Sequence, residues 1–395
     1  MTMPEITESL VQQIKQQVST ERLLETAVKL VEIPSPTCDA TEVANCLAEM
    51  LQQEEFSVQR PEAGWSTAPA VVARYDTGKD GRTLQFNGHL DTVHLPFVPP
   101  RVEEGILYGS GVSDMKGGLA AAVEAMRVVR ETGLLSGGGI LLTAHDLHEA
   151  PWGDGSQVDQ LIREGYVGDA VMLPEYSSDR LSVIGRGLAI LEVSVQREGG
   201  PVHEVLGGRE QPDVIAAGAE LVQRLQALDV HLAEREHPVA GRESLFVGKI
   251  NSGEIYNQSP TCFELSGTRR WLPGTDPSAV EAEFREVLAA VEQRPGITCE
   301  ATFHFVRDAY ELDPGHAAAC SFQSACQAVM GEPLPESFKP FVDDGNTFYA
   351  LAGIPAITHG PNALGAHTVE EEVPVEELVR VAQVYALTAL AFCPG

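Results

Sequence analysis

The feature that most constrains the fold is a regular alternation of helix-type and strand-type segments over the first part of the chain. The helix-type segments carry apolar residues at helical spacing, and the first two begin at capping residues. The strand-type segments are short apolar runs that lead into polar loops. In chain order the segments are helical at 19–33 and 41–56, extended at 68–76 and 82–91, helical at 114–133 and extended at 138–146. This alternation predicts an α/β sheet with helices on its faces.

The length of the chain and a later change of pattern predict two domains. The 395 residues exceed what a single hydrophobic core usually supports. Residues 187–308 follow the order strand-helix-strand-strand-helix-strand, which suits a small α+β domain of ferredoxin-like order. The earlier pattern then returns, so we expect 1–186 and 309–395 to form one domain into which 187–308 is inserted.

Composition excludes several classes of partner. The formal net charge of −30 would repel the phosphates of nucleic acids and of anionic membranes. No run of about 18 apolar residues is present to span a membrane, and the polar N-terminus does not resemble a secretory signal. The seven cysteines are scattered and none forms a C-x-x-C pair, which favours free thiols in a reducing compartment. We therefore expect a cytoplasmic protein with neither a nucleic-acid nor a membrane partner.

Histidines and carboxylates collect where predicted strands end. In "LLTAHDLHEAPWGDG" (141–155), a buried strand leads directly into His145, Asp146, His148 and Glu149. Other such residues lie in loops after strands, namely His89, Asp91, Asp114, Glu175 and His367. Ligand sites on α/β sheets gather at the carboxyl ends of strands, and zinc accepts both types of ligand. Taken singly, each residue is also typical of a polar loop, or of a helix cap in the case of Asp114.

Four motifs in a fixed order carry a resemblance to a known family. They are "GHLDTV" (88–93), "DMKGG" (114–118), "LPE" (173–175) and "GAHTVEEEV" (365–373), with the small domain inserted before the last. With them the chain resembles, over nearly its whole length, the di-zinc aminoacylase and carboxypeptidase family. This family includes acetylornithine deacetylase, succinyl-diaminopimelate desuccinylase and glutamate-type carboxypeptidases. The resemblance implies a mixed-sheet, zinc-peptidase-like catalytic domain and an inserted domain that serves as lid and dimerisation surface.

The resemblance also implies a ligand set for two zinc ions per chain, with cobalt or manganese as alternative metals. His89 and Glu175 would bind one ion and His367 the other, Asp114 would bridge both, and Asp91 would stand behind His89. Two zinc ions about 3.5–4 Å apart can share a carboxylate and a water, activate that water and polarise a carbonyl.

The pair His148-Glu149 departs from the family pattern, which has two adjacent glutamates here, a general base followed by a metal ligand. Aligning strand with strand makes Glu149 the ligand and puts His148 in the position of the base. Shifting the register by one makes Glu149 the base and leaves Ala150, which cannot bind metal. A third interpretation makes His148 a ligand and Glu149 the base. Glu149 is essential in each of them.

In the inserted domain, the resemblance assigns His203 to the substrate oxyanion across a dimer and Arg270 to a substrate carboxylate. We therefore expect a homodimeric, zinc-dependent hydrolase that cleaves the amide bond of an N-acyl amino acid through a metal-bridging water. A metallo-carboxypeptidase or dipeptidase acting on short peptides is the alternative enzyme. A binding protein that has lost its general base is the alternative from another class.

Overall fold

A computed structural model describes residues 6–394 and divides into two compact units. Unit 2 comprises Ile184–Glu311 and Phe338–Asn346, and unit 1 comprises the rest. The sequence predicts nearby boundaries for the inserted domain but places 338–346 in the other one. This segment belongs to unit 2 because Asn346 Nδ2 donates to the backbone carbonyls of Arg186 (3.3 Å) and Asp308 (2.6 Å). No helix of the described residues is long and apolar enough to cross a membrane.

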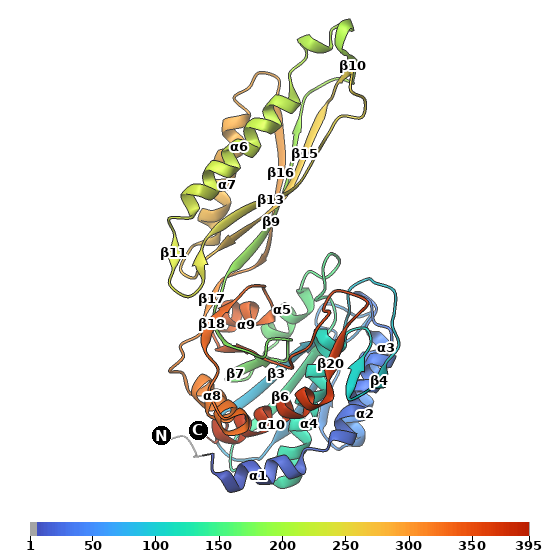
Figure 1. Cartoon of the computed structure of the whole chain (residues 1–395), viewed down its shortest axis with the longest axis vertical. Helices are drawn as coiled ribbons and strands as arrows, with labels where there is room; N and C mark the ends of the chain where they lie inside the picture. Colours follow the sequence, from blue (N-terminus) through green and yellow to red (C-terminus); the bar gives the residue numbers. More distant parts are fainter. Residues whose placement is uncertain (1–5, 395) are drawn as a thin grey trace. The chain divides into compact units, whose positions relative to one another are not determined.

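Unit 1 contains a six-stranded sheet in the order β1-β2-β6-β3-β7-β19 (Figure 1). The strands are β1 (Ser57–Gln59), β2 (Val71–Asp76), β3 (Thr83–His89), β6 (Gly139–His145), β7 (Ala170–Leu173) and β19 (Ala356–Thr358). Strands β6, β3, β7 and β19 run parallel to one another. Strand β2 pairs antiparallel with both of its neighbours, β1 and β6. The predicted α/β fold with a mixed sheet is thereby confirmed, and the carboxyl ends of the parallel strands meet at one edge.

Helices cover both faces of this sheet. On one face, Tyr385 of α10 contacts Phe86 of β3, and α10 also packs against α4 and α8. On the other face, apolar residues of α5 and α9 pack against β7 and β19. The helices are α1 (Glu8–Gln17), α2 (Thr20–Glu32), α3 (Thr41–Gln53), α4 (Gly117–Thr132), α5 (Ser156–Arg163), α8 (Ala317–Met330), α9 (Asp344–Ala352) and α10 (Val375–Phe392). Burial on both faces explains why β6 and β7 are largely apolar runs, whereas the buried polar residues of β3 need partners, as where Gln85 donates to Thr143 of β6.

The expected cap of α3 is wrong. Thr41 does not cap the helix, because its hydroxyl donates to the backbone carbonyl of Thr67 (2.8 Å). The carboxylate of Asp146 instead accepts the N–H groups of Cys38 and Ala40, at 3.0 and 3.2 Å. This carboxylate therefore holds the chain that leads into α3, whose N-cap residue is Ala40, whereas α2 does begin at the predicted cap Ser19.

Unit 2 has an antiparallel sheet in the order β13-β15-β9-β16, and α6 and α7 pack on one of its faces. In chain order the elements are β9 (Gly187–Gln196), α6 (Val214–Leu232), β13 (Ser244–Ser252), β15 (Cys262–Trp271), α7 (Pro277–Val291) and β16 (Thr298–Arg307). This is the strand-helix-strand-strand-helix-strand order predicted from the sequence. The clean alternation of buried and exposed residues along β9 and β15 shows a sheet with one covered face.

Short elements complete the fold. Three-stranded sheets are formed by β4 (Arg101–Glu103), β5 (Ile106–Tyr108) and β20 (Glu372–Pro374), and by β8 (Leu181–Gly185), β17 (Tyr310–Glu311) and β18 (Glu336–Lys339). Two-residue pairs are β10 (Val202–His203) with β14 (Gln258–Ser259) and β11 (Glu236–His237) with β12 (Gly241–Arg242). A π-helical turn, Val112–Lys116, leads into α4.

Candidate metal centre

The candidate site lies in unit 1 at the carboxyl ends of β3, β6 and β7. His89 is the last residue of β3 and pairs in register with His145, the last residue of β6. Glu175 follows β7 by two residues. Four carboxylate side chains of the site are almost completely buried, with exposed fractions of 6% or less: Asp91, Asp114, Glu149 and Glu175. Buried carboxylates require cations or strong hydrogen bonds, which makes this edge of the sheet a plausible place for metal ions.

The imidazole of His89 is oriented by a backbone group. Its Nδ1 lies 2.9 Å from the carbonyl oxygen of Asp91, so Nδ1 donates there and Nε2 is left to face Asp114 Oδ1 at 3.0 Å. The carboxylate of Asp91 is 3.7 Å from Nδ1, beyond hydrogen-bond distance. The carboxylate thus lies behind His89 at ion-pair distance, while the hydrogen bond that fixes the ring goes to the carbonyl of the same residue.

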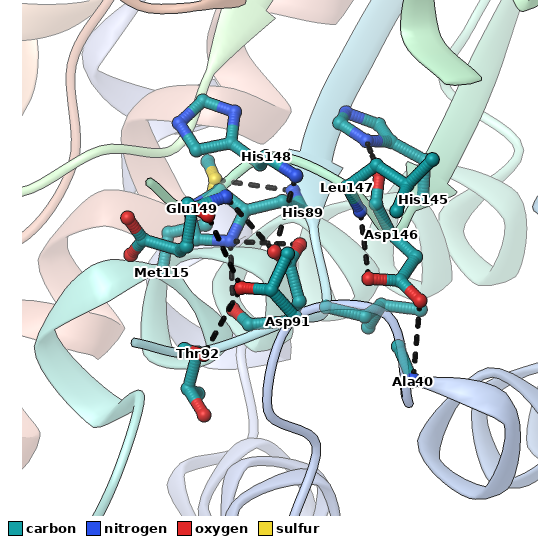
Figure 2. Close-up of polar contacts among 12 residues, drawn as sticks. Ala40, His89, Asp91, Thr92, Met115, His145, Asp146, Leu147, His148 and Glu149 are labelled. Carbon is teal, nitrogen blue, oxygen red and sulfur yellow. Dashed lines mark hydrogen bonds and ion pairs between the residues drawn. The ribbon is translucent and has the colours of Figure 1, made fainter. Parts of the chain in front are cut away.

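The carboxylate of Asp91 holds a different part of the site. Its Oδ2 accepts the backbone N–H groups of His148 (3.1 Å) and Glu149 (2.9 Å), as Figure 2 shows. The loop is closed by two further backbone bonds, from Gly153 to the carbonyl of Glu149 and from Gly155 to that of Leu147. Through its carbonyl and its carboxylate, Asp91 thus connects the end of β3 to the loop after β6.

Asp114 lies between two histidines. Its Oδ1 faces His89 Nε2, and its Oδ2 lies 3.2 Å from His367 Nε2. The same nitrogen of His367 is 3.2 Å from Glu149 Oε2. The structure thus brings His89, Asp114, Glu149 and His367 together. Asp114 is not the cap of α4, because Lys116 occupies that position and the carboxylate of Asp114 faces the two histidines.

The charges of these groups are strongly coupled in the protein without metal. The hydrogen bonds with Asp114 and Glu149 raise the pKa of His367 to about 10. Burial by itself would lower the pKa of His89, but the Asp114 carboxylate outweighs this effect and raises it well above its usual value. Burial would likewise raise the pKa of Asp114, yet its two histidine partners lower it. Protons on the two histidines therefore stand where cations would bind.

Sequence reasoning missed Glu371, which shapes the turn that carries Asp114. Its Oε1 accepts the N–H of Gly111 (3.0 Å), and its Oε2 accepts those of Ser113 (3.0 Å) and Asp114 (3.3 Å). The side chain is 4% exposed, and burial raises its pKa to about 7 against the opposing effect of these bonds. The residue stands within the quoted motif "GAHTVEEEV", but three adjacent glutamates gave no indication of which one is buried.

Two sets of side chains have the spacing of metal ligands. In the first, ligand atoms of His89, His148 and Glu175 all lie within 4.8 Å of one another. In the second, the same holds for His89, Asp114 and Glu149. Imidazoles and carboxylates are ligands that zinc and neighbouring divalent metals accept. The donor set therefore fits the pair of ions that the sequence resemblance implies.

The remaining predicted residues have other surroundings. Asp146 accepts the two backbone bonds described above and one from Trp65 Nε1 at 3.2 Å, so its carboxylate is used in holding the chain. His203 and Arg270 belong to unit 2. The ring of His203 has a nitrogen 3.0 Å from Asn257 Nδ2, and burial lowers the pKa of Arg270, with a smaller effect from Arg186.

Comparison with known proteins decides the family. Residues 85–391 match the profile of peptidase family M20/M25/M40. The chain belongs to this family. Among curated relatives, N-formyl-4-amino-5-aminomethyl-2-methylpyrimidine deformylase of Bacillus subtilis is 25% identical, covering 94% of this chain and 95% of its own. Succinyl-diaminopimelate desuccinylase of Delftia acidovorans is 34% identical, covering 93% and 97%.

Solved structures of the family share the fold. Aminopeptidase PepT from Bacillus cereus superimposes with a TM-score of 0.80 at 18% identity, covering 95% of this chain and 100% of that one. The M20 protein is therefore a hydrolase of the metallopeptidase and amidohydrolase type.

Proposed function

We propose that this M20 protein is a two-zinc hydrolase that removes an acyl group from the amide nitrogen of an N-acyl amino acid. The observation that carries the proposal is the carboxylate of Asp114 lying between His89 and His367, with Glu149 beside the latter. A shared carboxylate between two imidazoles is the arrangement that a pair of ions needs. The two curated relatives support the choice of reaction, because their names, deformylase and desuccinylase, both denote removal of an acyl group.

The five candidate ligands and Asp91 have distinct roles in this proposal. His89 and Glu175 would hold one ion, Glu149 and His367 the other, and Asp114 both. Bound zinc supplies an activated water and a polarised carbonyl. Asp91 would bind no ion and would instead fix the loop that presents Glu149.

We place His203 and Arg270 of unit 2 on the substrate. His203 would stabilise the oxyanion across a homodimer, and the forked guanidinium of Arg270 suits a substrate carboxylate. Nη1 of the half-buried Arg270 is buried without a hydrogen-bond partner, and a substrate carboxylate would supply the missing acceptor. The proposal includes a cytoplasmic location, which the seven free cysteines support, and sedimentation of the purified protein tests the dimer.

The experiment is a substrate panel with a matched pair of variants. Zinc-loaded protein is assayed with N-formyl, N-acetyl and N-succinyl amino acids and with dipeptides, and the released amine is measured. We expect the acyl amino acids to be hydrolysed faster. Glu149→Gln should lower kcat at least about 100-fold, because several kcal/mol of transition-state stabilisation come from the ions. Glu370→Gln makes the same charge change at an exposed neighbour of the site and should leave kcat unchanged.

The outcomes separate the three interpretations of the sequence. Faster hydrolysis of dipeptides would replace the deacylase with a peptidase. Two tightly bound ions without hydrolysis of any compound in the panel would favour a binding protein. Full activity of Glu149→Gln would remove Glu149 from the mechanism and overturn the proposed site.

A further inference from the structure

The side chain of His148 stands where the family pattern has a glutamate as general base, and the proposed function gives it no role. Its ring stacks on that of His89, with centroids 4.1 Å apart and planes inclined by 8° (Figure 2). One of its nitrogens belongs to the set that joins His89 with Glu175, all ligand atoms lying within 4.8 Å. His148 therefore lies with the residues proposed for the first ion.

The loop sends His148 and Glu149 to different neighbours. Their two backbone N–H groups share one acceptor, Asp91 Oδ2, which fixes the main chain at both positions. From this fixed turn Glu149 reaches His367, whereas the ring of His148 lies over His89. The fixed main chain thus directs the side chains of His148 and Glu149 to different halves of the site.

We propose that His148 is a metal ligand, so that the first ion is held by His89, His148, Glu175 and the shared Asp114. Ligand atoms on one zinc ion lie about 3.4 Å apart or less, so the 4.8 Å set closes when the His148 ring turns out of its stack on His89. Four protein ligands then leave the fifth position of a five-coordinate ion for the water. A neutral imidazole adds a donor without adding charge, whereas a general base at this position would become a cation beside two cations. The inference rests on the proposed function, because it concerns the same pair of ions.

The additional imidazole changes the metal preference of the site. Nitrogen donors favour zinc and cobalt, and oxygen donors favour magnesium and manganese. With His148 bound, the two ions share three imidazoles, from His89, His148 and His367, in place of the two that the family pattern provides. We therefore expect the first position to bind zinc about 10- to 100-fold more tightly than manganese. Zinc should then be retained there when manganese is present in a roughly 10-fold or greater excess.

The test counts imidazoles directly. X-ray absorption spectroscopy of the two-zinc protein is compared with that of His148→Glu, which restores the family glutamate. His148→Glu retains the loop, because Asp91 binds main-chain groups. The matched control is His231→Glu, the same substitution at an exposed histidine of unit 2. We expect three imidazoles per two zinc ions in the wild type and the control, and two in His148→Glu.

Zinc affinity provides a second measurement that does not depend on activity. In competition with a chromophoric chelator, His148→Ala should bind the first ion at least 10-fold more weakly than the wild type does. An imidazole number that is unchanged in His148→Glu, or two unchanged affinities in His148→Ala, would overturn the ligand role and leave the proposed hydrolase intact. A wild-type protein that binds no zinc would overturn both proposals.

Discussion

Removing the carboxylate of Glu371 should unfold the turn that presents Asp114 before it affects the rest of unit 1. Glu371→Ala leaves three N–H groups without an acceptor, those of Gly111, Ser113 and Asp114. An unsatisfied buried donor costs about 1–3 kcal/mol, and removing a buried charge recovers part of that sum. We expect a net loss of about 3 kcal/mol in the free energy of unfolding of unit 1.

The assay is urea unfolding of the zinc-free protein, followed by tryptophan fluorescence, with a neighbouring variant as control. Glu370→Ala removes the same charge from an exposed side chain next in the chain, so it should change the free energy of unfolding by less than about 0.5 kcal/mol. Glu371→Gln keeps one acceptor oxygen and should fall between the two. If Glu371→Ala unfolds at the same urea concentration as Glu370→Ala, the turn does not depend on this carboxylate and the reasoning is refuted.

Two further predictions concern protons and the loop after β6. Zinc binding should release protons, because His367 has a pKa of about 10 and His89 a raised one, and both must lose a proton to bind metal. Both histidines hold these protons at any pH below their raised pKa values, so zinc affinity should increase with pH up to about 10. Calorimetry in buffers of different ionisation enthalpy should show the proton release. Zinc binding without net proton release would contradict this prediction. Asp91→Asn replaces a charged acceptor with a neutral one and should weaken zinc binding about 10-fold, measured by chelator competition against the exposed control Asp80→Asn; equal affinities would show that the loop is held without this charge.

Local patterns predicted the elements because the patterns depend on neighbours in the chain. The spacing of apolar residues in 19–33 and the buried runs around Phe86 and Leu142 reflect helix and strand geometry directly, and α2, β3 and β6 follow. The order of elements in unit 2 is readable for the same reason, since β9 and β15 of its one-sided sheet alternate between buried and more exposed residues.

What the sequence could not predict depends on contacts between distant segments. Asp146 holds the chain before α3 through the N–H groups of Cys38 and Ala40, although more than a hundred residues separate it from them. Glu371 reaches the turn before α4 from the far end of the chain, and its two acidic neighbours in the sequence are indistinguishable from it by pattern. For Asp91, the motif indicated a partner for His89 but not which oxygen of the residue would serve.

The two attachments of Asp91 have a consequence for the order in which ions enter. Its carbonyl fixes the ring of His89, the proposed ligand of the first ion, and its carboxylate fixes the backbone of Glu149, the proposed ligand of the second. An ion that orders one half of the site thereby removes conformational freedom from the other half. The second ion then binds with a smaller loss of conformational entropy than the first. Zinc should therefore load cooperatively, so that at half-saturation empty and doubly filled molecules outnumber those with a single ion.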